Sequence, residues 1–128
     1  MLPAGQALEQ YYTNVFKRYE FREKTRQFFE KYDLLLSPTL PVPAFDVNRD
    51  LPIELEKSDR NVVSWAYYTY AFNLTGQPAA SIPAGFTKSK LPVGLQIVGR
   101  THQEVDIFRA AAVFEQAQPW ADRRPPIN

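Results

Sequence analysis

With 128 residues, 45% of them hydrophobic and 23% charged, the chain has the length and composition of one globular domain rather than of a disordered segment. Its 15 basic and 14 acidic residues leave a net charge of +1, which argues against nucleic acid as a partner. Cysteine is absent and His102 is the only histidine, so thiolate sites, zinc sites and Ser/His arrangements lack their usual parts. We expect neither a metal nor a cofactor.

Targeting and membrane signals are also absent from the sequence. No apolar run approaches the roughly 20 residues of a membrane span, and the N-terminus lacks the pattern of a secretory signal. We therefore expect a cytoplasmic protein without a membrane partner, organised as a single domain over residues 1–128.

The first third of the chain predicts a helix, a strand and a long loop. Residues 7–32 contain no Gly or Pro and repeat apolar side chains every three or four residues, which predicts a long amphipathic helix. The apolar run 34–36 predicts a strand covered on both faces. The prolines that follow, in 37–52, predict an irregular excursion over the surface.

A second helix is expected over residues 62–74, with Ser58 or Asp59 as its N-cap. Aromatic side chains surround nearly its whole circumference, which predicts that it is buried. Thr75-Gly76 and the following Pro78 predict a left-handed turn that ends the helix and delivers the chain into a central strand of small side chains.

The last third predicts a hairpin and a helix. A strand is expected at 79–82, closed by Pro83 and Gly85, then a polar turn at 88–90 and a strand over 92–99. Thr101 and Glu104 have the spacing of a capping box at the start of the last helix, with an apolar stripe behind them. The fold class is therefore α/β, a three-stranded mixed sheet with helices packed on it, in the order α-β-α-β-β-α.

The residues themselves offer little chemistry. No nucleophile elbow, P-loop or dinucleotide-binding glycine motif occurs, and no serine has a base near it in sequence. The carboxylate pairs Glu54/Glu56 and Asp46/Asp50 fall in the proline-rich region, where solvated charges are the simpler interpretation. His102 is expected in the first turn of the last helix as an exposed polar group.

Three motifs nevertheless follow one another along the chain: DLLLSPTLPVPAF at 33–45, WAYYTYAFNLTGQPAASIPAGF at 65–86, and LPVGLQIVGR at 91–100 with a helix ending in FRAAAVFEQ. In this order they resemble the C-terminal segment of the amidase signature family, and the resemblance covers nearly the whole chain. It implies a fragment of a larger fold, from an amide hydrolase that uses a Ser, a second Ser in a cis peptide and a Lys.

The Gly/Ser-rich stretch that carries the serine nucleophile in this family is not in the sequence. Acyl transfer needs a nucleophile, a base and oxyanion donors held together. We therefore assign no catalytic residue and expect the chain to be inactive alone, as scaffold and part of a substrate pocket. The implied partners are a small-molecule amide substrate and either the missing N-terminal portion or further copies of the chain.

Three residues are predicted to bind substrate. In the family branch that amidates mischarged tRNA, the resemblance implies an acidic residue at the position that corresponds to Trp65. This chain has an indole there. An apolar wall with one N–H donor suits an apolar or aromatic amide better than a charged aminoacyl group, although Trp65 as a plain core residue is an equal alternative. Thr39 and Phe45, on the loop after the first strand, are weaker candidates for the same pocket.

Two further hypotheses stay open at this point. The chain could be an autonomous α/β protein-interaction module, in which case its sheet edges and apolar surface should be covered. Alternatively, Lys and Ser side chains of two copies could meet across an interface to form an active site.

Overall fold

A computed structural model describes residues 4–52 and 64–123. Along the chain they form helix α1 (Ala4–Lys31), strand β1 (Leu34–Pro38), the 3₁₀ turn η1 (Ser64–Ala66), helix α3 (Tyr67–Thr75), strands β2 (Ala79–Phe86) and β3 (Pro92–Gly99), and helix α4 (Glu104–Ala117). The predicted α/β class and the order α-β-α-β-β-α are confirmed. The predicted caps Ser58 and Asp59 and the pair Glu54/Glu56 lie outside the described residues.

The three strands form one sheet in the order β1-β3-β2. Both pairings are antiparallel, with Leu36 opposite Ile97 on one side of β3 and Ala80 opposite Ile97 on the other. The sheet of the described residues is therefore not mixed, contrary to the prediction. The central strand is also β3, whereas the small-residue stretch 79–81 lies on an edge strand.

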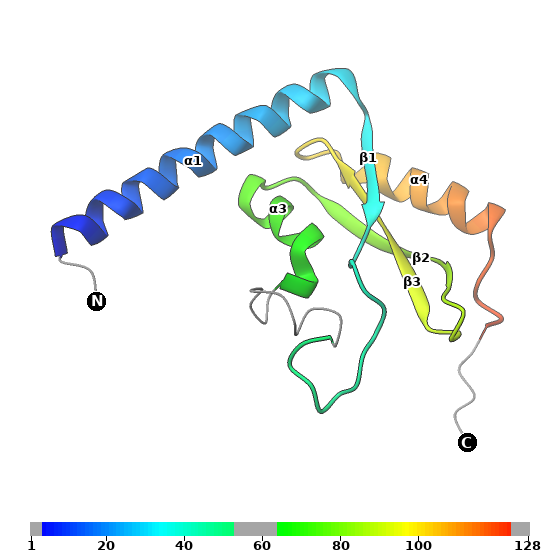
Figure 1. Ribbon diagram of the computed structural model, residues 1–128. Coiled ribbons are helices and arrows are strands. Elements are labelled where there is room, and N and C mark those ends of the chain that lie inside the picture. Colours follow the sequence, from blue (N-terminus) through cyan, green and yellow to red (C-terminus); the bar gives the residue numbers. More distant parts are fainter. Residues whose placement is uncertain (1–3, 53–63, 124–128) are drawn as a thin grey trace.

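The two faces of the sheet carry different elements. Alternate residues of a strand point to opposite faces, and Gly99 meets α4, since a Cβ at Gly99 would lie 3.0 Å from Ile107 Cγ1. Gln96 points to the other face and donates from Nε2 to the carbonyl oxygen of Tyr68 in α3, at 3.4 Å. Helix α4 thus covers one face, and α3 lies over the other (Figure 1).

The turn between α3 and β2 is confirmed. Gly76 adopts φ +83° and its N–H donates to the Phe72 carbonyl at 2.7 Å, which closes the helix in the left-handed conformation. The strand that follows runs to Phe86 rather than stopping at Ile82, because a register shift between Pro83 and Gly85 absorbs the proline without ending the pairing.

The predicted capping box is wrong. Helix α4 begins at Glu104 with Gln103 as its N-cap, and no side chain caps it. His102 precedes the helix and adopts φ +63°, instead of lying in the first helical turn. Thr101 therefore lies two residues before the N-cap, and Glu104 is the first helical residue instead of the third, so the two side chains do not form the box. His102 is exposed, as expected.

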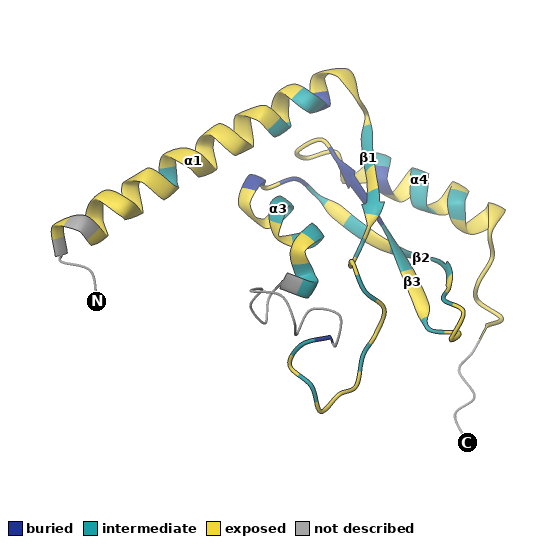
Figure 2. Ribbon diagram, viewed as in Figure 1, coloured by how far each residue is buried: buried dark blue, intermediate teal, exposed yellow. Residues whose placement is uncertain are grey.

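Burial is lower than the sequence suggests. The buried apolar side chains of the described residues are Phe29, Pro52, Ile97, Val98 and Ile107. Leu36 is 57% exposed, so β1 is not covered on both faces, and Tyr67 is 67% exposed, so α3 is not buried around its circumference. Figure 2 shows that α1 is exposed along most of its length. These elements have apolar surfaces that the described residues leave uncovered.

Candidate functional site

Two of the three predicted substrate-binding residues are in contact. The loop after β1 folds back so that the Phe45 ring meets the Trp65 ring edge to face, with centroids 5.7 Å apart and an interplanar angle of 77°. Both side chains are half-buried. Phe45 comes from the proline-rich loop and Trp65 from η1, so the pair joins two segments that are 20 residues apart in sequence.

Thr39 lies elsewhere, in an apolar groove of about 400 Å³. The groove is built from the loop after β1 and from both strands of the hairpin, and its lining residues are Thr39, Leu40, Pro41, Val42, Pro43, Ala44, Ser81, Thr87, Pro92, Val93 and Gly94. Neither Phe45 nor Trp65 lines it. The structure therefore separates the three predicted residues into an aromatic pair and a groove.

A pair of hydroxyl groups lies in this groove. Thr39 Oγ1 and Ser81 Oγ are 2.6 Å apart and hydrogen-bonded. Thr39 is held in place by its backbone, whose N–H donates to the Gly94 carbonyl at 2.9 Å and so extends the β1 pairing by one residue. No sequence pattern indicates this pair, because its members are 42 residues apart and meet only when β1 and β2 flank β3.

Sequence reasoning missed Gln96, which connects three elements on this face of the sheet. It is 4% exposed, and its Nε2 donates to Ser37 Oγ at 3.0 Å and to the Tyr68 carbonyl at 3.4 Å. One amide group thus joins β3, β1 and α3. Helix α3 follows Trp65 directly along the chain, so these bonds help to position the aromatic pair. A glutamine within the apolar strand VGLQIVG is the signal that could have identified it, since buried polar groups need partners.

No catalytic arrangement occurs among the side chains of the described residues whose contacts are defined. Ser37 bonds to Gln96 and to the Pro38 carbonyl, and Ser81 bonds to Thr39, so neither faces a lysine or histidine. Asp46 accepts a bond from the backbone N–H of Asn48 at 2.8 Å, as in a solvated turn. Within residues 4–52 and 64–123, no group of three or more His, Asp or Glu side chains could hold a metal ion.

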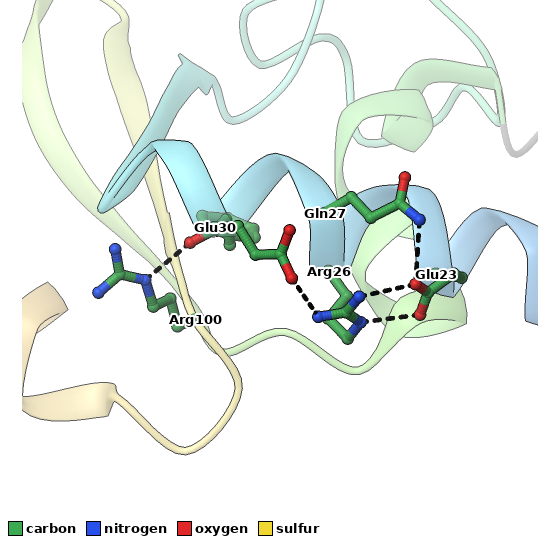
Figure 3. Close-up of polar contacts among 6 residues, drawn as sticks. Glu23, Arg26, Gln27, Glu30 and Arg100 are labelled. Carbon is green, nitrogen blue, oxygen red and sulfur yellow. Dashed lines mark hydrogen bonds and ion pairs between the residues drawn. The ribbon is translucent and has the colours of Figure 1, made fainter.

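The one strongly perturbed carboxyl of the described residues lies on α1, away from the groove. Arg26 donates to both oxygens of Glu23 at 2.8 Å and to Glu30 at 2.7 Å (Figure 3). The hydrogen bonds from Arg26 lower the pKa of Glu23 to about 2. Beside them, Arg100 donates to the Phe29 carbonyl at 2.8 Å and to Asp33 at 2.7 Å, which ties the end of α1 to the end of β3. These interactions hold the helix and are unrelated to the groove.

No helix in the described part of the chain has both the length and the apolar character needed to cross a membrane.

Comparison with known proteins identifies the family. The amidase family model matches residues 2–108. An acylamidase from Rhodococcus erythropolis is 40% identical over 100 residues, which are 77% of this chain and 21% of that protein. One subunit of a glutamyl-tRNA(Gln) amidotransferase from Thermodesulfovibrio yellowstonii is 40% identical over 99 residues, 76% of this chain and 19% of that protein.

Solved structures agree with the sequence comparison. A bacterial aryl acylamidase of the amidase signature enzymes superimposes with a TM-score of 0.77 and 30% identity, over 92% of this chain and 26% of that one. The chain spans about a fifth of the length of the curated relatives it matches, and about a quarter of this solved structure. Since the family match covers most of the sequence, and the fold matches over the same region, the chain belongs to the amidase signature family.

Proposed function

We propose that this chain is the C-terminal segment of an amide hydrolase, where it supplies scaffold and one wall of the substrate pocket. The contact between Phe45 and Trp65 carries the proposal. Two half-buried rings at right angles present an apolar surface with a single indole N–H donor, which suits an apolar or aromatic amide. The names of two relatives, an acylamidase and an aryl acylamidase, point to substrates of this kind.

The bond-breaking groups come from outside this segment. Hydrolysis of an amide needs a nucleophile activated by a base, and donors for the developing oxyanion. Ser37 and Ser81 bond to a glutamine, a threonine and a carbonyl oxygen instead. Assayed alone on acetanilide and butanamide, the chain is expected to give no turnover above the buffer rate; measurable turnover would contradict this part of the proposal.

The aromatic wall can be tested by fluorescence. Because the chain has two tryptophans, the experiment uses a Trp120→Phe background in which Trp65 is the only reporter. Acetanilide should change the Trp65 emission saturably. Phe45→Ala should weaken this response about 2- to 10-fold, since an edge-to-face ring contact is worth about 0.5–1.5 kcal/mol.

Phe108→Ala is the matched control, because Phe108 is 70% exposed on α4 and belongs to neither the pair nor the groove. It should leave the titration unchanged. An emission change that does not saturate, or one that Phe45→Ala leaves intact, would remove the aromatic pair from the substrate pocket.

A further inference from the structure

The apolar groove is distinct from the Phe45–Trp65 pair and has the dimensions of a small-molecule site. Its volume of about 400 Å³ lies within the roughly 300–1,000 Å³ typical of ligand pockets. Its lining includes no lysine, arginine, aspartate or glutamate. Leucine, proline, valine and alanine side chains form most of the wall, and three hydroxyls, those of Thr39, Ser81 and Thr87, supply its polar side-chain atoms.

The Thr39–Ser81 hydroxyl pair has hydrogen-bonding capacity left over. One hydroxyl donates its proton to the other across 2.6 Å. The accepting hydroxyl keeps its own proton, which it can donate outward, and both oxygens retain lone pairs. The pair therefore offers one polarised O–H donor at an otherwise apolar wall, which matches the carbonyl oxygen of an uncharged group.

Gly94 makes room for this pair. A Cβ at position 94 would lie 2.7 Å from Ser81 Oγ and 2.7 Å from Thr39 Oγ1, closer than side-chain atoms pack. The two hydroxyls therefore occupy the space that any other residue at this point of β3 would fill. The hydroxyl pair can therefore keep this geometry only because Gly94 has no side chain.

We propose that the groove is a second subsite that binds the carbonyl of a neutral amide through the Thr39–Ser81 pair, with the apolar substituents of that amide against Leu40, Val42 and Val93. This inference rests on the proposed function. It narrows the proposed substrates to uncharged amides that carry an aliphatic group. The lining contains no charged side chain that could pair with a carboxylate or an ammonium group.

The test is an NMR titration of the ¹⁵N-labelled chain with N-propylbutanamide, followed at the backbone amides of residues 39, 81 and 94. Saturable shifts are expected at these positions. Butyrate and propylammonium, which carry a charge on a similar aliphatic group, should bind more weakly, because the groove offers them no ionic partner. Thr39→Val keeps the side-chain shape and removes the hydroxyl, and should weaken the neutral amide about 2- to 10-fold.

Gly94→Ala is the second variant, because its methyl group displaces the hydroxyl pair, and it should weaken binding at least as much as Thr39→Val. Circular dichroism is used to check that each variant is folded. Absence of shifts at residues 39, 81 and 94, equal binding of the charged analogues, or unchanged affinity in Thr39→Val overturns the subsite.

The two proposals fail separately. If acetanilide still changes the emission of Trp65 while Thr39→Val binds N-propylbutanamide normally, the subsite is wrong and the aromatic wall stands. If Trp65 does not respond while the groove titrates as expected, the aromatic wall is wrong.

Discussion

At the residue scale, the turn at Gly76 determines how α3 is connected to the sheet. Thr75, the last residue of the helix, is 2% exposed and donates from its hydroxyl to the Ala71 carbonyl at 3.1 Å. Gly76 then reverses the backbone at φ +83°. Two residues later, the Pro78 carbonyl accepts a bond from the Gly99 N–H at 3.1 Å, so the chain is already aligned with β3. The reversal is thus coupled to the register of the sheet.

Gly76→Val should destabilise the chain strongly, because a β-branched residue at positive φ is strained. A cost of about 1–2 kcal/mol or more for the left-handed conformation should lower Tm by several degrees, or prevent soluble folding. Gly76→Asn is the matched control, since asparagine tolerates this conformation, and it should lose less. Thermal denaturation followed by circular dichroism measures both; a Gly76→Val chain with an unchanged Tm would show that the turn is not required.

At the element scale, α1 is held mainly near its C-terminal end. Its 28 residues span roughly 42 Å at 1.5 Å per residue. Arg100 bonds to Phe29 and Asp33 at that end, and farther back Arg18 donates to the Leu74 carbonyl at 2.8 Å. The Glu23–Arg26–Glu30 run reinforces the same part of the helix (Figure 3). The first half of α1, by contrast, carries exposed aromatic side chains.

The pKa of Glu23 should report on this run. Hydrogen bonds from Arg26 lower it from 4.5 to about 2. The folded helix therefore gains stability from this carboxylate above about pH 4.5, and loses it as the pH falls toward 2. A ¹³C NMR titration of the Glu23 carboxyl should give a midpoint near 2, and Arg26→Met should return it toward 4.5. A midpoint near 4.5 in the unmodified chain would mean that the ion pair does not persist in solution.

At the scale of the whole molecule, the chain exposes more surface than a compact monomer of its size. Its accessible area is 10377 Å², whereas a folded monomer of 14.7 kDa exposes roughly 6,900 Å². The large apolar side chains that are more than half exposed on α1 are Leu8, Tyr11, Tyr12, Phe16 and Tyr19. Apolar surface of this extent marks an interaction site. It argues against an autonomous module with a covered sheet.

We therefore expect the isolated chain to associate. Light scattering at tens of micromolar should give a mass above 14.7 kDa that rises with concentration, and a hydrophobic dye should bind. The double change Tyr12→Lys and Phe16→Lys should shift the mass toward the monomer, because it places two positive charges among the exposed apolar side chains of α1. Glu9→Gln, on the same helix, is the control that should leave the association unchanged. A clean monomer that binds no dye would contradict the expectation.

Local patterns were sufficient for much of this fold. The absence of Gly and Pro in 7–32 predicts the long helix, which spans Ala4–Lys31, and Pro92 marks the first residue of β3. The Gly76 turn follows from backbone sterics alone. These features depend on interactions between residues close in sequence, so each segment determines them by itself. The family resemblance is also carried by such short, ordered motifs.

Long-range contacts decided the rest. Trp65, Phe45 and Thr39 are candidates from the sequence, but only the folded chain joins the first two and pairs the third with Ser81. The predicted capping box is wrong because the chain turns at His102, in the left-handed conformation, and the helix begins only at Glu104. Periodicity overestimated burial because it reveals an apolar face without revealing what covers that face. Sequence therefore determined which backbone most segments adopt; the antiparallel pairing of β1 and β2 with β3 decided that Thr39 and Ser81 meet, since that contact connects residues 42 positions apart.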